Sequence, residues 1–467
     1  MSMTAAPTSE PEPASLAGVA SKPISVQILF LAAPALIQQG LLLVVQLYDQ
    51  FLAGQYTESH QAALTTANYL YWFTTSYTVV VNAGATALVG RLVGGGDLPT
   101  ASRAVGQAIL LAIAFGTAAS VAGLLGLPLF VSTLGLSGFG ATVAVDYLLP
   151  LAGLLPFYMT ETACIACLVG AGDTRTGLKT LLLVVIVNTP AAWGLSHGSW
   201  GLPNLGFVGI AWGTGLAHVV GCFYVVSVLL RGRFGLRLRW AWLLPDRALL
   251  TRLLRVSIPA ALDSLSVGVF QFVFLGFVNR IGETAAAAHG VAIRLEGLGY
   301  LSGAAFATAT SAIVSRALGE KRPDLAAKAG WTALLYGAGV MTFMGMLFFV
   351  FARDMFEIFC RGEGQQEVID VGVPVLRLIA FAMPGLAGSI ILTQALRGSG
   401  DTRVPVLFTW VGFVGVRIPL AAILTDPYFG IELGLIGAWA AMFVDIYVRG
   451  AFYLMRFAGG KWKTARV

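Results

Sequence analysis

Gly170-Ala-Gly172-Asp173-Thr174-Arg175 is followed, 228 positions later, by the nearly identical Gly398-Ser-Gly400-Asp401-Thr402-Arg403. Each hexapeptide lies between two long apolar stretches, at the same place in its half of the chain. Similarity at a fixed spacing is the sign of a structural unit that is present twice. In membrane proteins built from such repeats, the working site lies where the copies face each other. The two hexapeptides therefore predict one membrane unit in two copies.

The composition is that of a membrane protein. Of the 467 residues, 57% are hydrophobic and 11% are charged, and the mean hydropathy is +0.80. A transmembrane helix needs about 20 mostly apolar residues. Twelve segments meet this requirement: 24–53, 62–90, 105–130, 143–169, 178–195, 206–230, 256–278, 286–314, 329–351, 370–395, 404–424 and 433–455. No segment shows the alternating pattern of a membrane β-strand. We therefore predict an all-α membrane protein with twelve transmembrane helices.

Other landmarks recur in the two halves and fix their register. These pairs lie 224 to 228 positions apart: Pro34 and Pro259, Arg91-Leu-Val-Gly94 and Arg316-Ala-Leu-Gly319, Pro156 and Pro384, and Gly206-Phe-Val-Gly209 and Gly434-Leu-Ile-Gly437. Each half has six helices, so both copies enter and leave the membrane on the same side. The prediction is two parallel six-helix repeats, an N-lobe and a C-lobe, related by an axis along the membrane normal. Two such bundles can rock around a central cavity, which suits a carrier better than a pore.

The chain divides into two bundles, a linker and two tails. Residues 1–22 are rich in Pro, Ser and Ala, lack the pattern of a secretory signal, and are expected to form a disordered cytoplasmic tail. The N-terminal bundle is predicted over 23–230 and the C-terminal bundle over 256–456. Residues 231–255 form a basic cytoplasmic linker, and 457–467 form a basic cytoplasmic tail.

The distribution of basic residues predicts the orientation. Of the 29 Lys and Arg residues, 22 lie in the tails or in the even-numbered loops. The positive-inside rule then places both termini in the cytoplasm of a multi-pass protein of the inner (plasma) membrane. The net charge of +6 reflects this topology and does not indicate a nucleic-acid partner. The expected partner of the basic linker is the anionic surface of the lipid bilayer, and we expect the protein to act as a monomer.

Each hexapeptide is interpreted as the short turn between the fourth and fifth helices of its half. Gly permits a tight reversal of the chain, and Asp or Thr can cap the helix that follows. The element lacks the Gly-Lys-Ser/Thr ending of a loop that binds nucleotide phosphates. We therefore predict a structural turn and no nucleotide site.

Asp49 is the strongest candidate for a functional residue, because a charge inside the bilayer is costly and marks a site unless a partner explains it. Segment one also carries Gln46, and segment five carries Asn188. Segment two adds a polar and aromatic stripe at helical spacing: Asn68, Trp72, Thr75 and Asn82. Together these residues predict a hydrated cavity in the N-lobe. An Asp there can bind a proton or hold a cation; the alternative is a buried Asp that only holds helices together.

Further candidates for the cavity are spread over segments four, seven and eight. They are Tyr158, Glu161, Asp263, Gln271, Glu296 and Tyr300. Structural alternatives stay open for the acids: Arg294 is close enough to neutralise an acid from elsewhere, the alternative for Glu296 is a structural ion pair, and Asp263 lies near the predicted helix start. Aromatic rings that face a cavity favour amphipathic cations through apolar contact and cation–π attraction.

At this point the chain resembles the multidrug and toxic compound extrusion (MATE) family over nearly everything after residue 24. The resemblance rests on these motifs in this order: Pro34 with Asp49, Gly84-Ala-Thr-Ala-Leu-Val-Gly90-Arg91, the two hexapeptides, Ala288-His289-Gly290, Arg417-Ile-Pro419-Leu, Leu435-Ile-Gly-Ala-Trp439, and Arg456-Phe-Ala-Gly-Gly-Lys-Trp462-Lys. The resemblance implies a two-lobed exporter that exchanges organic cations or other small-molecule drugs for entering H⁺ or Na⁺. It implies no enzymatic activity and no cofactor beyond the coupling ion.

The resemblance also implies ion-coupling residues. Family members often pair the acid of segment one with an Asn and an Asp in segment five and a Thr in segment six. Asp49, Asn188 and Thr214 match, but Ala192 stands where the second Asp would be. A hard cation prefers several oxygen ligands, so H⁺ at Asp49 is the first choice and Na⁺ the alternative, with no certain metal site. Many relatives use an acid in segment seven, and Asp263 is the matching residue.

Two other functions are compatible with a polytopic membrane protein. A flippase for lipid-linked precursors with the same architecture would need several basic residues in the cavity, whereas the candidates here are acids, amides and aromatics. A polytopic membrane enzyme would show paired Asp-rich metal motifs, and the sequence has none. The absence of a phosphate-loop motif argues against ATP as the energy source.

Overall fold

The computed structural model describes the chain except for a few short stretches. The described residues are 22–133, 138–360, 365–425, 431–465 and 467. Within them all regular elements are helical, apart from one isolated β-bridge between Arg233 and Leu236. Except for Lys22, the predicted disordered tail lies outside the described residues.

The described residues of the first half of the chain form seven α-helices: α2 (Ile24–Ala53), α3 (Glu58–Gly94), α4 (Leu98–Thr133), α5 (Gly138–Gly153), α6 (Leu155–Gly170), α7 (Thr174–His197) and α8 (Val208–Arg231). The second half contains α9 (Arg247–Ile281), α10 (Glu283–Gly319), α11 (Pro323–Val350), α12 (Ala352–Phe359), α13 (Gln366–Ser399), α14 (Arg403–Gly412), α15 (Ile418–Thr425) and α16 (Gly434–Ala458). Among the described residues, eleven spans are long and apolar enough to cross a bilayer, and the bent pair α5–α6 makes twelve. The prediction of an all-α, twelve-helix membrane protein is confirmed.

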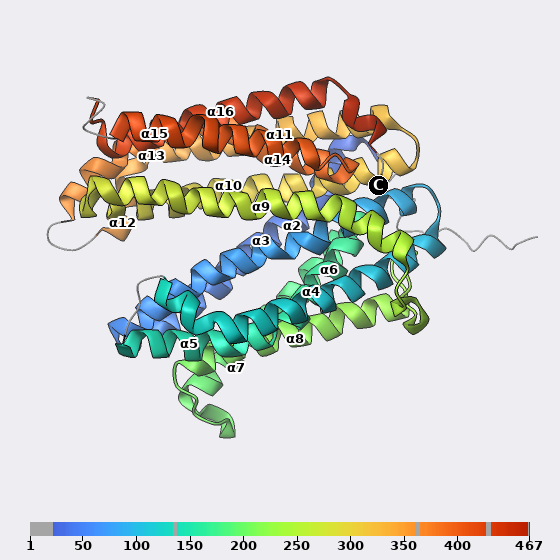
Figure 1. Ribbon diagram of the computed structural model, residues 1–467, viewed down its shortest axis with the longest axis horizontal. Coiled ribbons are helices and arrows are strands. Elements are labelled where there is room, and N and C mark those ends of the chain that lie inside the picture. The colour runs from blue at the N-terminus through green and yellow to red at the C-terminus, as the bar shows by residue number, and fades with distance from the viewer. Residues whose placement is uncertain (1–21, 134–137, 361–364, 426–430, 466) are drawn as a thin grey trace, which may run out of the picture.

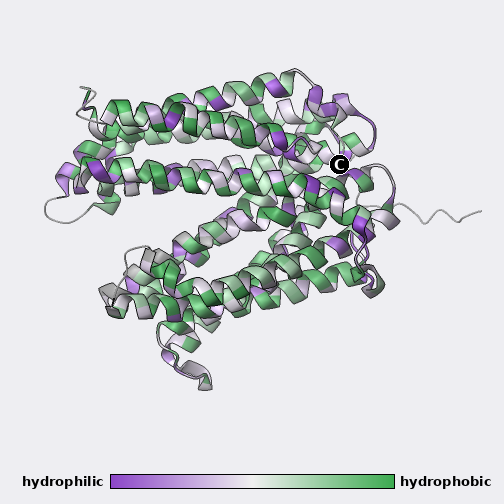
Figure 2. Ribbon diagram, viewed as in Figure 1, coloured by the Kyte–Doolittle hydropathy of each residue, from purple (hydrophilic) through white to green (hydrophobic). Residues whose placement is uncertain are grey.

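The helices form two bundles that approach each other at one end. In Figure 1, α9 to α16 make up one bundle and α4 to α8 the other, while α2 and α3 run obliquely between them. The bundles converge near the C-terminus and diverge toward α5 and α12. Apolar residues cover both bundles along their length, as the hydropathy colouring in Figure 2 shows. Helices that are apolar on nearly all faces are typical of membrane-spanning helices.

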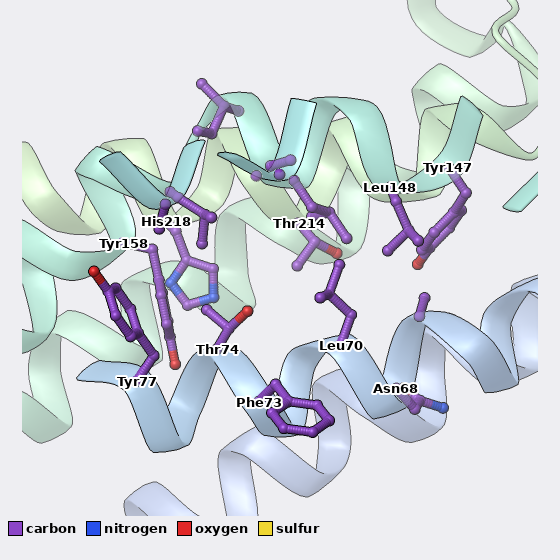
Figure 3. Close-up of a pocket in the computed structure, with 18 of the residues that line it drawn as sticks. Asn68, Leu70, Phe73, Thr74, Tyr77, Tyr147, Leu148, Tyr158, Thr214 and His218 are labelled. Carbon is purple, nitrogen blue, oxygen red and sulfur yellow. The ribbon is translucent and has the colours of Figure 1, made fainter. Parts of the chain in front are cut away.

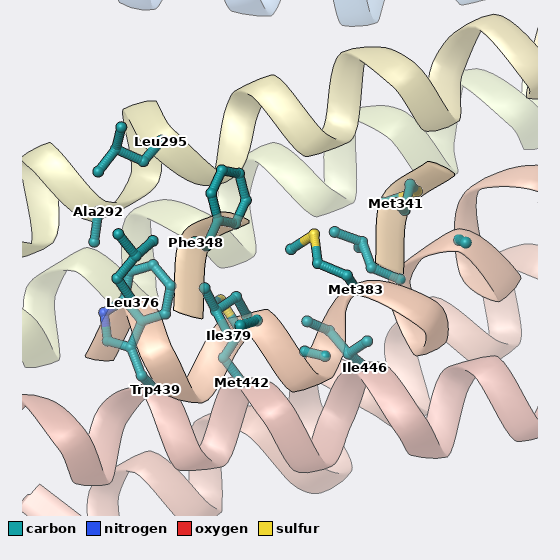
Figure 4. Packing of buried hydrophobic residues seen from close by; sticks show 14 of the residues in the cluster. Ala292, Leu295, Met341, Phe348, Leu376, Ile379, Met383, Trp439, Met442 and Ile446 are labelled. Atoms are coloured by element: carbon teal, nitrogen blue, oxygen red, sulfur yellow. The ribbon is translucent and has the colours of Figure 1, made fainter. Parts of the chain in front are cut away.

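The first helix of each repeat packs against the opposite lobe. Ile28 and Leu31 at the start of α2 are fully buried in a cluster made mostly of C-lobe residues. Leu253 near the start of α9 is fully buried in the core of the N-lobe, against α3 and α4. The C-lobe core is a dense apolar packing of large side chains (Figure 4). The start of the first helix of each repeat is therefore buried against the opposite lobe, while the rest of the helix also contacts its own lobe.

The close end of the molecule is built from the two matching Arg-x-x-Gly motifs. A Cβ atom added at Gly94 would overlap the backbone carbonyl of Arg316, and one at Gly319 would overlap the carbonyl of Arg91. Glycine lets two helix backbones approach closely where lipid supplies no hydrophobic driving force. The glycine of each motif thus lies against the arginine carbonyl of the other motif, so the two repeats make equivalent contacts. We call this the hexapeptide end, because both hexapeptides lie there.

Both hexapeptides form turns of the predicted kind. Gly172 and Gly400 have φ angles of +92° and +91°, a region that favours glycine. Asp173 caps α7, accepting a hydrogen bond of 3.0 Å from the backbone N–H of Thr176. Asp401 makes no such cap. Both aspartates accept a hydrogen bond from an arginine Nε, Asp173 from Arg233 at 3.0 Å and Asp401 from Arg456 at 2.8 Å. The turn and the ion pair are common to both copies, but only Asp173 also caps a helix.

Helix breaks distinguish the two repeats. The predicted single helix 143–169 is wrong in detail, because α5 and α6 meet at an angle of 50°. Pro150 lies in α5 and Pro156 in the first turn of α6, and proline removes a backbone donor and clashes with the preceding turn. The matching helix α13 stays continuous through Pro384. The second repeat instead has a π-helical turn, η3 (Phe413–Arg417), before Pro419.

The segments predicted as the basic linker and the basic C-terminal tail are partly helical. α9 begins at Arg247, so the last nine residues of the predicted linker 231–255 are helical; a short 3₁₀ helix, η2 (Trp240–Leu243), precedes them. Within 457–467, α16 ends at Ala458 and is followed by the 3₁₀ helix η5 (Lys461–Thr464). Trp462 in η5 is fully buried and stacks on Phe457. The tail packs on the protein.

Candidate functional site

Three helices of the N-lobe bring Asp49, Asn188 and Thr214 together. They are α2, α7 and α8, and all three side chains meet in the interior of the lobe. The hydroxyl of Thr214 lies 3.1 Å from Oδ2 of Asp49 and 3.4 Å from Oδ1 of Asn188. Asp49 is 9% exposed and Asn188 1%. Among the described residues, Oδ1 of Asp49 and Nδ2 of Asn188 have no hydrogen-bond partner. The site therefore holds a buried carboxylate whose Oδ1 atom is available for a further hydrogen bond or a proton.

Close packing of α7 on α8 creates this meeting point. A Cβ atom at Gly213 would lie 2.5 Å from the backbone of Ala192, so the two helices touch there. Ala192 is fully buried. This is the position at which the family resemblance implies a second Asp, and Ala192 supplies no side-chain oxygen there.

A cavity of about 460 Å³ opens beside Asp49. Its walls are mostly apolar, and α2 to α8 supply all of its lining except for Leu265 of α9. The polar and aromatic side chains are placed around it as Figure 3 shows, with Tyr77 and Tyr158 near one end and Tyr147 near the other. Among the described lining residues there is no Lys or Arg. Such a cavity suits an apolar ligand with few polar groups.

The cavity wall also contains His218, which pairs with Glu161. The Nδ1 atom of His218 lies 2.8 Å from Oε2 of Glu161. Tyr158 packs its ring edge-on against His218, with 4.9 Å between the centroids. His218 lies on α8 one turn after Thr214, which contacts Asp49. Two ionisable positions thus face one chamber.

Three of the residues predicted to line a substrate cavity do line this one: Gln46, Asn68 and Tyr158. The others are placed elsewhere: Trp72, Thr75, Asn82, Glu161, Gln271, Glu296 and Tyr300. Glu161 is screened from the chamber by His218, and Trp72 contacts Phe272 of the opposite lobe. Asn82 borders a smaller cavity of about 110 Å³ between the lobes, together with Arg397. Their roles in function stay predictions.

Asp263 is held by an arginine. Its Oδ2 atom lies 2.8 Å from Nη2 of Arg397, which also contacts Ser264. The expected place near a helix start is wrong, since α9 begins at Arg247 and Asp263 is sixteen residues further along. The pair joins two helices of the C-lobe beside the smaller cavity. Asp49 and Asp263 therefore do not share a site.

A second buried charge cluster holds the C-lobe together. Asp445 accepts hydrogen bonds from Arg417 at 2.8 Å and from Arg449 at 2.8 and 2.7 Å. Arg417 also donates to Oε1 of Gln271 at 3.1 Å. Both guanidinium groups lie over the ring of Phe413, at 4.3 and 4.7 Å. Gln271 is thus part of a structural network, and the alternative of an ion pair between Arg294 and Glu296 is not seen among the described residues.

Sequence reasoning missed His218 and Arg397. His218 follows Thr214 by four residues, so both lie on one helix face, and that spacing was the available signal. Arg397 lies directly before the second hexapeptide, where the sequence suggests a loop, but α13 continues to Ser399. No local pattern connects Arg397 with Asp263, because the two residues are far apart in the chain.

These observations define a polytopic membrane protein of two helical lobes, with a buried acid in an apolar chamber. A family model described as MatE matches residues 34–193 and 259–423, which is more than half of the chain. The chain therefore belongs to the MatE family and is a multi-span membrane transporter.

Relatives and solved structures agree with this assignment. The chain is 27% identical over 449 residues to the probable multidrug resistance protein NorM of Thermotoga maritima, covering 95% of this chain and 94% of that protein. It is 23% identical over 436 residues to the uncharacterized transporter YisQ of Bacillus subtilis, covering 92% and 93%. In fold it is similar to a MOP superfamily transporter from Pyrococcus furiosus described as having a binding pocket of reverse polarity, with a TM-score of 0.89, 19% identity, and 97% and 100% coverage. It is also similar to an outward-facing multidrug resistance MATE transporter, with a TM-score of 0.87, 18% identity, and 97% and 100% coverage.

Proposed function

We propose that this transporter exports amphipathic organic cations across the inner membrane in exchange for entering H⁺, with Asp49 as the coupling carboxylate. The observation that carries the proposal is the chamber beside Asp49, which places one buried acid against a space large enough for a small organic molecule. A carboxylate that binds a proton loses its charge, whereas one that binds an organic cation keeps it. One residue can therefore accept either the proton or the substrate, which is the requirement of an antiporter.

The lining of the chamber supports a cationic, amphipathic substrate. Its walls combine apolar residues with the rings of Phe73, Tyr77, Tyr147 and Tyr158. Aromatic faces attract organic cations, and apolar walls accept their hydrocarbon parts without strict shape selection. Relatives named as probable multidrug resistance proteins fit a broad substrate range. A lipid-linked, anionic precursor would need basic residues in the chamber, and its described lining offers none.

The ligands around Asp49 support H⁺ over Na⁺. A sodium ion prefers several oxygen ligands in a defined cage. Asp49, Asn188 and Thr214 supply oxygens, but the fully buried Ala192 supplies none where the family resemblance implies a second acid. A proton needs a single carboxylate oxygen, and Oδ1 of Asp49 has no other hydrogen-bond partner among the described residues. We therefore propose a proton-coupled cycle.

We further propose that the hexapeptide end faces the cytoplasm, with both chain termini on that side. Most Lys and Arg residues lie there, in agreement with the positive-inside rule. The lobes contact each other closely at this end through Gly94 and Gly319. Transport would then proceed by alternating access, in which this contact opens when the lobes rock. The arrangement described here corresponds to the state that is closed to the cytoplasm.

The test is efflux from vesicles that contain the purified protein. Uptake or release of a panel of organic cations, with tetraphenylphosphonium as the first probe, is measured under separate H⁺ and Na⁺ gradients. We expect transport under a pH gradient without Na⁺ and its loss when the gradient is dissipated. Asp146, which is exposed on α5, offers a matched control, Asp146→Asn, for the variant Asp49→Asn. Transport that depends on Na⁺ alone would overturn the choice of ion, and transport of none of the cations would overturn the substrate class.

A further inference from the structure

The chamber contains an ionisable pair that the coupling role of Asp49 leaves unexplained. His218 and Glu161 lie 2.8 Å apart through Nδ1 and Oε2. The side chain of His218 is 12% exposed and that of Glu161 is 3% exposed. The imidazole therefore stands between the carboxylate and the chamber. A pair that served only to join two helices would not need its titrating member in the cavity wall.

The surroundings are shaped to hold this pair in place. A Cβ atom at Gly221 would lie 2.8 Å from Oε1 of Glu161, so the glycine leaves the room that the carboxylate occupies. Tyr158 supports the ring of His218 from the side, as Figure 3 shows. Since an ionised carboxylate only accepts hydrogen bonds, it fixes the proton of the neutral imidazole on Nδ1. The Nε2 atom is then the position at which His218 gains a second proton.

We propose that His218, held by Glu161, is a second proton-binding site of the chamber, at which a proton and an organic cation compete. This inference rests on the proposed function and concerns the same chamber. An organic cation beside the wall repels an imidazolium, because like charges in a medium of low dielectric constant disfavour each other. Substrate entry therefore releases the proton of His218, and proton binding at His218 weakens the hold on the substrate. Glu161 acts through His218 as a positioning residue.

Other titratable groups lie in the chamber wall or near α8, and their effects have to be distinguished from that of His218. Those in the wall are Asp49 of α2, Tyr77 of α3, Tyr147 of α5 and Tyr158 of α6. Glu161 of α6 contacts His218 directly, and the buried Cys164 of α6 and Cys222 of α8 lie outside the lining. In the part of the chamber that the structure describes, α4 and α7 contribute apolar lining. Tyrosine and cysteine titrate well above neutral pH in water. Asp49 is thus the only other group of the chamber wall that has to be tested alongside His218.

The experiment measures the affinity of the purified full-length protein for tetraphenylphosphonium between pH 5.5 and 8.5. Each proton that competes with the cation changes the dissociation constant by up to about tenfold per pH unit. We expect a steep pH dependence in the unchanged protein, a shallower one in His218→Gln and in Asp49→Asn, and none in the double variant. Glu161→Gln should move the His218 component to lower pH, because the imidazolium loses its counter-charge. His197→Gln, at the exposed end of α7 and outside the chamber, is the matched control.

The outcomes separate the inference from the proposed function. If the unchanged protein neither binds nor transports the cation, the proposed function fails. If it binds and transports, but His218→Gln shows the same pH dependence as the unchanged protein, the inference is wrong and the pair is only structural. If His218→Gln fails to fold, Glu161→Gln serves as the test. A displaced pH dependence of the affinity for tetraphenylphosphonium in this variant supports the inference, and an unchanged pH dependence overturns it.

Discussion

Asp49 of the N-lobe and the buried acids Asp445 and Asp263 of the C-lobe have opposite surroundings. In the N-lobe, Asp49 meets the neutral side chains of Thr214 and Asn188 beside an open chamber. In the C-lobe, Asp445 is clamped between two arginines, and Asp263 is paired with Arg397. The helix arrangements of the lobes are alike, since the same landmarks and the same helix contacts occur in both. The polar side chains in the interiors of the two lobes are different.

This difference shows how one architecture separates two tasks. An acid without a fixed cation can bind and release a proton as its surroundings change. An acid held by guanidinium groups keeps its charge, and breaking such a buried pair is costly. Under the proposed proton-coupled cycle, the N-lobe carries the chemistry of coupling, while the ion pairs of the C-lobe stabilise the packing of that lobe.

The largest expected effect follows from removing the unpaired acid. Asp49→Asn keeps the size of the side chain and its contact with Thr214, but it cannot bind a proton as a carboxylate does. Coupled efflux should fall to the level of cells that lack the protein, while membrane expression and thermal stability stay close to those of Asp146→Asn. Growth under drug challenge and vesicle efflux measure the loss. Normal drug resistance in Asp49→Asn would remove the functional distinction between the lobes.

The next largest effect is expected on stability, in the C-lobe. Asp445→Asn leaves two buried arginines without a counter-charge, and breaking a buried ion pair costs about 3–5 kcal/mol. We expect a much lower unfolding temperature in detergent and low expression. Replacing all three charged residues by apolar ones of similar size (Asp445→Leu, Arg417→Met, Arg449→Met) should restore part of the stability. If Asp445→Asn is fully stable but inactive, this cluster takes part in transport and the comparison has to be revised.

Much of the fold could be predicted because it depends on local composition. A long apolar segment has few alternatives to a membrane-spanning helix, and the two hexapeptides fixed the register of the halves. The positions at which helices bend or break are harder to predict from the sequence. Pro156 bends the chain between α5 and α6, whereas Pro384 lies in a continuous helix, although both occupy the same place in their repeats. The bend depends on Pro150 and on packing partners, which a spacing rule does not contain.

The candidate site could be predicted where the residues lie on different helices but match a known pattern. The family resemblance groups Asp49, Asn188 and Thr214 as ion-coupling residues, and Thr214 lies within hydrogen-bonding distance of the other two. His218 was missed because a single histidine in an apolar helix carries little information without its neighbour Glu161. The pairing of Asp263 with Arg397 joins residues far apart in the chain, so only the tertiary packing reveals it.

A smaller effect is expected from the glycine contacts that the two lobes share at the hexapeptide end. Gly94→Ala and Gly319→Ala each insert a methyl group against a backbone carbonyl of the opposite helix. Overpacking of this kind costs about 1–3 kcal/mol, and here the cost falls on the state closed at the hexapeptide end. Both variants should slow transport to a similar degree, because the two contacts are equivalent. Gly96→Ala makes a useful comparison, since nothing lies near a Cβ atom there but its φ of +77° is strained. Clearly unequal effects of Gly94→Ala and Gly319→Ala would show that the internal symmetry does not extend to function.

The smallest effect is expected within the two hexapeptides. Asp173 caps α7 through the backbone N–H of Thr176, and loss of such a cap costs about 1 kcal/mol. Both aspartates also pair with a partly exposed arginine, Asp173 with Arg233 and Asp401 with Arg456, and an ion pair near the surface contributes about 0.2–1 kcal/mol. Only Asp173 adds a helix cap, so Asp173→Ala should lower the unfolding temperature more than Asp401→Ala, and high salt should remove a larger fraction of the effect of Asp401→Ala. Asp173→Ser, which retains a capping oxygen, should recover the part of the loss that is due to the cap. Equal effects with the same dependence on salt would mean that the two turns are as alike in their energetics as they are in sequence.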